Sequence, residues 1–159
     1  MASTQCEVPA FNPEDSEIKE ILSQYKIIAV VGLSDDPSKD SNRVAQYLIH
    51  HGYTVVPVNP TKETILGLKC YPNLKSIPFP VDIVDIFRKP ADVPPVVDDA
   101  IAIGAKVVWM QLGIAHNEAA KKAKEAGLKV VQSKCIKMEH TRYFGTGQET
   151  VSFNINLNQ

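Results

Sequence analysis

Residues 27–62 constrain the fold of this chain more than any other segment. They read IIAVVGLSDDPSKDSNRVAQYLIHHGYTVVPVNPTK: an apolar run, a glycine, a stretch with apolar residues at helical spacing, a second glycine and a second apolar run. Continuous apolar runs of this length are typical of strands that are buried on both faces of a parallel sheet. We therefore expect a strand–turn–helix–strand unit whose glycine turn, at Gly32, presents a helix start to an anion.

The rest of the chain repeats this alternation of apolar runs and helical stretches. The five expected strands are residues 27–31, 54–58, 81–87, 106–110 and 128–131. Helical stretches are expected between them, with a short helix before the first strand and another from Cys135 to Tyr143. This pattern predicts an α/β fold: a Rossmann-like, doubly wound, mostly parallel five-stranded sheet in a single domain. Right-handed crossovers favour a 3-2-1-4-5 strand order.

Composition predicts where the folded domain begins and ends. Residues 1–13 are polar and hold two prolines, so we expect a flexible N-terminal arm. Residues 14–144 form the expected domain, and residues 145–159 a C-terminal tail. Within the tail, residues 150–157 alternate weakly between apolar and polar side chains, which is typical of an edge strand.

Charge and cysteine content exclude several kinds of partner. The formal net charge is -1, with 17 basic and 18 acidic residues, so we expect neither nucleic-acid nor membrane binding. The N-terminus lacks the basic and apolar regions of a secretory signal, and we expect a cytoplasmic protein. Its three cysteines, Cys6, Cys70 and Cys135, include no CxxC pair, so free thiols and no metal site are expected.

Ligands of such sheets bind outside the carboxyl ends of the strands, next to the first strand. The residues that follow each strand are therefore the candidates for a binding site. These are Gly32, Leu33 and Ser34; Asn59, Pro60 and Lys62; Arg88 and Pro90; Gln111, Leu112 and Gly113; and Cys135, with Arg43 near the start of the first crossover helix.

The end of the second strand distinguishes between nucleotides. An NAD-binding unit usually has Asp or Glu there, to accept hydrogen bonds from ribose hydroxyls. This chain has Asn59, Pro60 and Lys62 instead, which suits a phosphorylated ribose, as in coenzyme A or NADP. Asp35 and Asp36 are expected as turn residues, and an acidic pair so close to a phosphate opposes binding unless it points away.

Two readings of Cys135 remain open. It is either a thiol close to the reactive end of a ligand or a buried and inert cysteine, which is the more common case. Trp109 follows Val107 and Val108, so we expect it in the core.

Several ordered motifs resemble those of the small stand-alone CoA-binding proteins. They are VVGLS, PVNPTK, DIFRKP, VVWMQLGI and SKCIKMEH, and together they extend over roughly residues 14–144. These proteins are similar to the N-terminal CoA-binding domain of the succinyl-CoA synthetase alpha subunit. The resemblance implies that Ser34, Asp35, Asp36 and Pro37 line the first loop, that Lys62 meets a CoA phosphate, and that Phe87, Met110, Gln111 and Leu112 belong to the site, with Cys135 near the thiol end.

We therefore expect a protein that binds coenzyme A or an acyl-CoA without catalysis of its own. The synthetase's phosphorylated histidine belongs to a second domain that has no counterpart in this sequence. The alternative is an NAD(P)-dependent oxidoreductase or redox sensor on the same fold. A second copy of the chain and a ligase subunit are the candidate protein partners.

Overall fold

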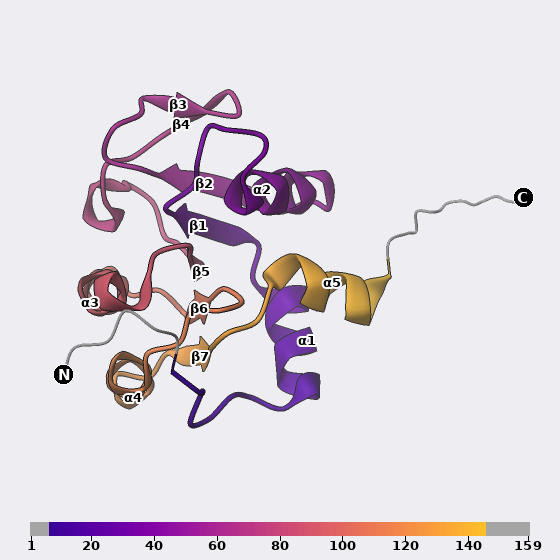
Figure 1. Ribbon diagram of the computed structural model, residues 1–159, viewed down its shortest axis with the longest axis vertical. Helices are drawn as coiled ribbons and strands as arrows, with labels where there is room; N and C mark the ends of the chain where they lie inside the picture. The colour runs from indigo at the N-terminus through magenta and orange to yellow at the C-terminus, as the bar shows by residue number, and fades with distance from the viewer. Residues whose placement is uncertain (1–6, 146–159) are drawn as a thin grey trace, which may run out of the picture.

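A parallel sheet runs through the middle of the molecule, with helices packed against both of its faces (Figure 1). The computed structural model describes residues 7–145. The elements in chain order are α1 (Asp15–Gln24), β1 (Ile27–Val31), α2 (Asp40–His50), β2 (Thr54–Val58), β3 (Thr64–Ile65), β4 (Leu68–Lys69), η1 (Leu74–Ser76), β5 (Ile83–Ile86), η2 (Pro90–Asp92), α3 (Val93–Ala102), β6 (Val107–Met110), α4 (Asn117–Glu125), β7 (Lys129–Val131) and α5 (Ile136–Phe144).

The two faces of the sheet carry separate apolar cores. Side chains alternate along each strand, so Ala29 and Val31 face one layer of helices while Ile28 and Val30 face the other. The layer of α3 and α4 covers the first face, and α1, α2 and α5 cover the second (Figure 1). The α/β class, the parallel sheet of five strands and the approximate bounds of those strands are confirmed.

The predicted strand order was wrong. The sheet has the order β2-β1-β5-β6-β7, so the strand expected beside β2 instead pairs with the other side of β1. The connection after β2 contacts the outer edge of that strand: Tyr71 forms a parallel bridge with Val58, and its N–H donates to the Pro57 carbonyl at 3.0 Å. β5 joins the sheet on the other side of β1. The switch point of the sheet therefore lies between β1 and β5.

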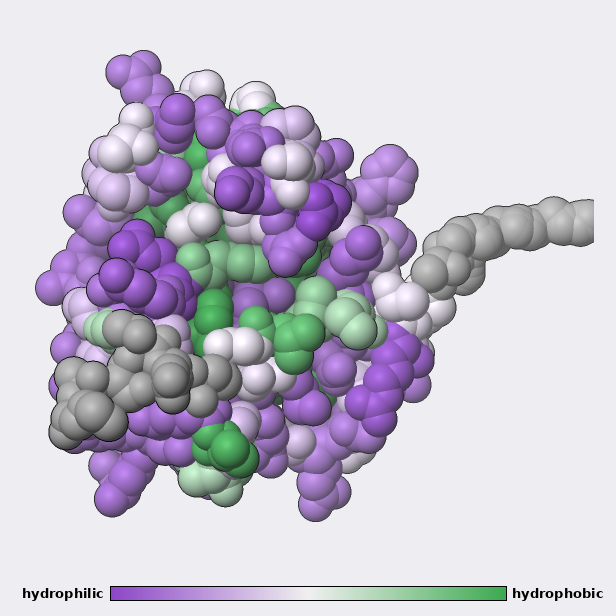
Figure 2. Space-filling model, in the orientation of Figure 1, coloured by the Kyte–Doolittle hydropathy of each residue, from purple (hydrophilic) through white to green (hydrophobic). Residues whose placement is uncertain are grey.

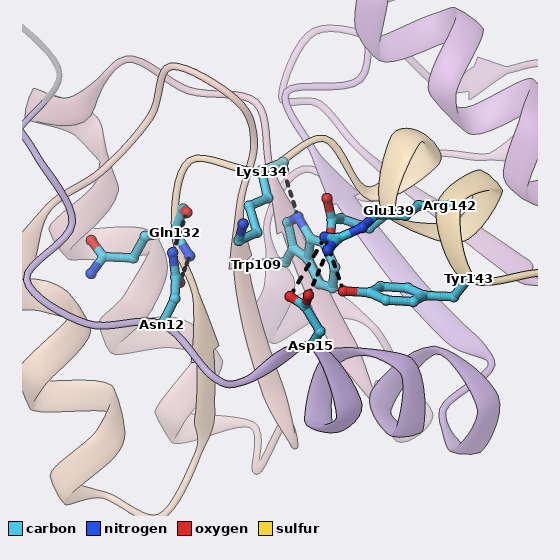
Figure 3. A network of polar contacts seen from close by, with 8 residues as sticks. All are labelled: Asn12, Asp15, Trp109, Gln132, Lys134, Glu139, Arg142 and Tyr143. Atoms are coloured by element: carbon cyan, nitrogen blue, oxygen red, sulfur yellow. Dashed lines mark hydrogen bonds and ion pairs between the residues drawn. The ribbon is translucent and has the colours of Figure 1, made fainter.

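The side chain of Asn12 pairs with the backbone directly after β7, at the edge of the sheet. The amide of Asn12 donates to the Gln132 carbonyl at 3.0 Å and accepts from the Gln132 N–H at 2.7 Å (Figure 3). Phe11 packs against the core beside it. Residues 7–13 of the expected arm thus lie along β7 and the start of α4. Residues 1–6, and the edge strand expected at 150–157, lie outside the described residues.

Main-chain hydrogen bonds join the strands at their amino ends. The carboxylate of Asp82 accepts from the N–H groups of Lys26 and Ile27 at 3.2 and 3.1 Å, and its carbonyl accepts from Lys106 and Val107. The Lys106 carbonyl in turn accepts from Lys129 at 3.0 Å. The Asp82 carboxylate and main-chain hydrogen bonds therefore link the strands at this end of the sheet.

One polar side chain in the core has no partner. Asp85 lies in β5 between Val30 and Trp109 on the neighbouring strands and is fully buried. Neither carboxylate oxygen has a hydrogen-bond partner. Burial raises the pKa of Asp85 well above its usual value, because the charged form is disfavoured in this apolar environment.

A polar and aromatic cluster joins α2 to α5. The Tyr47 hydroxyl lies 2.8 Å from Nδ1 of His140 and 2.8 Å from Oγ1 of Thr141. The ring of His51 stacks on Tyr47 with 3.9 Å between centroids. Burial, together with the neighbouring His51, lowers the pKa of His140 to about 4.

Across residues 7–145, every helix is too short or too polar to pass through a lipid bilayer.

Candidate functional site

The glycine turn brings the ends of β1 and β5 into close contact. Gly32 has a φ of +88°, and a Cβ atom at this position would lie 2.5 Å from the Phe87 carbonyl oxygen and 3.0 Å from Cδ of Arg88. Only glycine tolerates both the backbone conformation and the contact. The turn predicted at Gly32 is therefore confirmed, and the contact with Phe87 explains why the residue is a glycine.

The loop after Gly32 is fixed by neighbouring side chains. The N–H of Ser34 donates to Oγ of Ser41 at 3.0 Å, and its carbonyl accepts from the amide of Asn42 at 2.8 Å. The amide of Asn59 donates to the Leu33 carbonyl at 3.0 Å. Ser41 and Asn42 are buried, so they set the path of the loop. No local pattern predicted a role for Ser41, because its contact with Ser34 depends on how the loop folds back on α2.

The two aspartates of this loop have different partners. The Asp36 carboxylate accepts from the N–H and the hydroxyl of Ser38 at 2.9 and 2.8 Å, and these two bonds lower its pKa. Asp36 is therefore a turn residue, as the sequence indicated. Asp35 extends to the loop after β2, where its Oδ2 lies 3.0 Å from Nζ of Lys62.

Three cations that were predicted for the site lie at this edge of the sheet, each beside a carboxylate. Lys62 pairs with Asp35, Arg43 with Asp40, and Arg88 with Asp92. The side chains of the cations are 41–52% exposed. Ion pairs this exposed contribute only about 0–1 kcal/mol, so an anionic ligand can replace the carboxylates.

A small cavity lies on the β2 side of the glycine turn. Its volume is about 150 Å³, and predicted residues Gly32, Pro60 and Arg88 line it. Pro72 and Asn73 complete the wall. These two were not predicted, because they come from the middle of the long connection after β2 rather than from the end of a strand.

A second cavity of about 320 Å³ lies on the β6 and β7 side, between the starts of α2 and α5. Its lining includes the predicted residues Arg43, Phe87, Gln111, Leu112 and Cys135. The sequence analysis did not predict Ile114 or Met138, which also line it. Leu112 and Met138 are 63% and 60% exposed, and hydrophobic surface crosses the middle of this face (Figure 2).

Two hydrogen bonds through Lys134 fix the loop that carries Cys135. The indole N–H of Trp109 donates to the Lys134 carbonyl at 2.7 Å (Figure 3), and the Lys134 N–H donates to the Met110 carbonyl at 3.2 Å. Ser133 has a φ of +55°, which turns the chain into α5. Cys135 is half-buried and lies at the start of that helix, with its side chain in the larger cavity.

Some predicted residues lie beneath this edge rather than on it. Leu33 and Met110 have no exposed surface, and Pro90 is buried. Gln111 is 4% exposed, and its Oε1 accepts from the Ile136 N–H at 3.1 Å. Gly113, by contrast, is exposed, and its N–H donates to Oγ of Ser133. These residues support the loops that form the two cavities.

Larger hollows exist elsewhere. One of about 460 Å³ lies between α3 and α4, and one of about 660 Å³ lies between residues 10–11 and α4. Neither is lined by the glycine turn or by the loops after β2 and β7. Among residues 7–145, no three His, Cys, Asp or Glu side chains are grouped so that they could hold a metal ion. The strand ends thus provide two cavities on either side of a single turn: the smaller has Arg88 and Asp99 in its lining, and the larger is mainly apolar but also includes Asp40, Arg43 and Lys137.

Comparison with known proteins identifies sequences and structures similar to this chain. A family model described as "CoA binding domain" matches residues 26–141. The uncharacterized protein YneT of Bacillus subtilis is 43% identical over 129 residues, which are 81% of this chain and 96% of that protein. A hypothetical protein from Pyrococcus horikoshii has a similar structure, with a TM-score of 0.83 and 46% identity, covering 91% of this chain and 100% of that one.

A longer enzyme contains a related segment. Acetate–CoA ligase (ADP-forming) I of Archaeoglobus fulgidus is 30% identical over 132 residues, which are 77% of this chain. The match spans only 19% of the ligase.

Proposed function

The chain belongs to the CoA-binding domain family, and from that membership we propose that it binds coenzyme A or an acyl-CoA at the carboxyl ends of its parallel strands, without catalysis of its own. Membership of this family supports CoA binding in general. We propose the identity of the ligand, its position and the absence of catalysis.

One observation carries the position of the ligand: the cations Lys62 and Arg88 follow β2 and β5 on one side of the glycine turn at Gly32, and a mainly apolar cavity lies on the other side. Coenzyme A has phosphates at its nucleotide end and a thiol at the end of a long, largely uncharged arm. The residues present fit this asymmetry. Lys62 and Arg88 would hold the phosphates of the nucleotide end, with Pro60 beside the ring system. Phe87, Leu112 and Met138 would surround the arm, and Cys135 would lie near its thiol.

The residues of the site favour binding over chemistry. Of the described residues that line the two cavities, none is a histidine. The carboxylates Asp40 and Asp99 in these linings form ion pairs with Arg43 and Lys75. The ligase relative is several times longer, so its activity is not carried over to this chain.

Native mass spectrometry followed by calorimetric titration tests the proposal. We expect heat on adding CoA or acetyl-CoA and a mass increase equal to one ligand per chain. No heat at millimolar CoA would reject the proposal. Binding of NADPH or NADH without binding of CoA would favour the oxidoreductase alternative.

Thiol labelling tests the position of the ligand. Cys135 is half-buried in the larger cavity, whereas Cys70 is buried and burial raises its thiol pKa. We expect desulfo-CoA, which has no thiol of its own to react, to slow iodoacetamide labelling of Cys135 and to leave the slow labelling of Cys70 unchanged. Equal labelling of Cys135 with and without the ligand would place the arm elsewhere.

A further inference from the structure

The Asp35–Lys62 ion pair connects the two loops that flank the nucleotide side of the proposed site. Asp35 belongs to the loop after β1 and Lys62 to the loop after β2, and their charged atoms are 3.0 Å apart. Both side chains are about half exposed, at 51% and 43%. The carboxylate therefore occupies the position beside Lys62 that a ligand phosphate requires.

We propose that Asp35 is an affinity-lowering residue, a resident carboxylate that competes with the 3′-phosphate of a nucleotide for Lys62 and is displaced only by such a more highly charged group. This inference rests on the proposed function. A phosphate monoester carries close to two negative charges at neutral pH, so it attracts the lysine more strongly than a carboxylate does. A ribose hydroxyl carries no charge and cannot displace Asp35.

The neighbouring acid does not share this role. Both hydrogen bonds of the Asp36 carboxylate go to Ser38 within its own turn, so its charge is already compensated locally. Asp35 is the acid of this loop whose ion pair crosses to the second loop. Its neighbours in the loop are fixed, because Ser34 is bonded on both sides by Ser41 and Asn42. Asp35 thus starts from a fixed backbone, and its side chain alone has to move away.

Displacement lowers the affinity for a ligand with the 3′-phosphate and leaves the affinity for a ligand without it unchanged, so Asp35 reduces the preference for the 3′-phosphate. A ligand without the 3′-phosphate leaves the ion pair intact and loses nothing when Asp35 is removed. A ligand with the 3′-phosphate has to break the ion pair and also accept a nearby negative charge. Removing the carboxylate should therefore increase affinity for the second kind of ligand only.

The experiment compares CoA with dephospho-CoA, which lacks the 3′-phosphate, by calorimetry on the wild type and on Asp35→Asn. We expect Asp35→Asn to bind CoA about three- to ten-fold more tightly at low salt, the range expected for removing one partly screened unit charge. Dephospho-CoA affinity should stay within about two-fold. The gain for CoA should shrink as salt rises toward 1 M, because screening weakens exposed charges.

Two controls isolate the cause. Asp98→Asn removes a carboxylate of matching exposure, 52%, from a Lys–Asp pair with Lys122 on the α3 and α4 side. It changes net charge equally, so it should leave CoA affinity unchanged. In a Lys62→Ala background, Asp35→Asn should lose its effect, because the two residues act as one unit. Thermal unfolding of each variant checks that the fold is retained.

The outcomes separate this inference from the proposed function. If the wild type binds no CoA, the proposed function fails and this inference falls with it. If the wild type binds CoA but Asp35→Asn changes CoA and dephospho-CoA equally, or neither, only the competition is rejected. Weaker CoA binding by Asp35→Asn would also overturn it, and would make Asp35 a residue that orients Lys62.

Discussion

A hydrogen atom in place of a side chain sets the geometry of the first loop. At Gly32 the backbone is left-handed and the Phe87 carbonyl lies where a Cβ atom would be. Gly52 has nearly the same φ, +90°, but has no atom within 4 Å of that position. A comparison of substitutions at the two glycines therefore distinguishes the cost of backbone strain, which both share, from the cost of the steric contact at Gly32.

We expect Gly32→Ala to lower the free energy of unfolding by about 3 kcal/mol or more, and Gly52→Ala by about 1–2 kcal/mol. Both substitutions place an alanine in the left-handed conformation, which costs free energy, but only Gly32→Ala forces β1 and β5 apart. Urea unfolding measures both values. Equal losses would show that the close contact at Gly32 contributes nothing.

Lys62 is the residue whose removal tests the nucleotide end most directly. We expect Lys62→Ala to weaken CoA binding by about 1–3 kcal/mol, the range for a lost charge-assisted hydrogen bond. Its half-exposed side chain predicts little effect on stability. Calorimetry measures the affinity, with Lys122→Ala as a lysine of a similar ion pair outside the site. An unchanged dissociation constant would remove Lys62 from the site.

At the scale of elements, the contact between α2 and α5 predicts a pH dependence. His140 is 8% exposed, bonded to Tyr47, and has a pKa of about 4, below its ordinary value near 6.5. As pH falls from about 6.5 to about 4, the unfolded chain binds a proton at this position and the folded protein does not. Stability from this group is therefore complete above pH 6.5 and declines toward pH 4.

Asp85 acts in the opposite direction, because its raised pKa keeps a proton in the folded state that the unfolded chain releases. A comparison of the wild type with His140→Gln cancels this effect, which is common to both proteins. We expect the stability of the wild type relative to His140→Gln to increase by about 2–3 kcal/mol between pH 4 and pH 6.5. Urea unfolding at several pH values measures it. A constant difference would mean that His140 titrates normally.

The sequence predicted the elements better than their neighbours in the sheet. Apolar runs located all five strands, because this signal is local. A doubly wound parallel sheet accommodates both the expected and the observed strand order, so no local signal distinguishes them. No periodicity in residues 60–80 indicates the bridge between Tyr71 and Val58 either.

At the scale of the whole molecule, residues 7–13 help to hold the sheet edge. The Gln132 backbone is bonded by Asn12, and Gln132 is fully buried. We expect Asn12→Ala to lower the free energy of unfolding by about 1–3 kcal/mol, because a buried N–H and carbonyl lose their partner. Asn12→Asp, which keeps the acceptor for the Gln132 N–H, should lose less. Urea unfolding compares the three proteins, and a neutral Asn12→Ala would show that water replaces the amide.

The candidate site could be predicted in outline, since carboxyl ends of parallel strands always meet at one edge. Residues directly after the strands, such as Arg88 and Cys135, were found in this way. Pro72, Met138 and the Asp35–Lys62 pair were not, because each depends on where a loop or helix returns to the edge. Sequence spacing contains no information about such returns.

The closed amino end of the sheet has a consequence for how such a protein changes over time. Asp82, Lys106 and Lys129 fix the strands in register at the end opposite to the ligand loops. Substitutions in those loops, apart from Gly32 with its close contact to Phe87, are therefore expected to leave the pairing of the strands intact. Proteins with this fold can therefore acquire new binding specificities through changes in one loop at a time. The contacts that maintain the fold and the loops of the proposed binding site lie at opposite ends of the same strands.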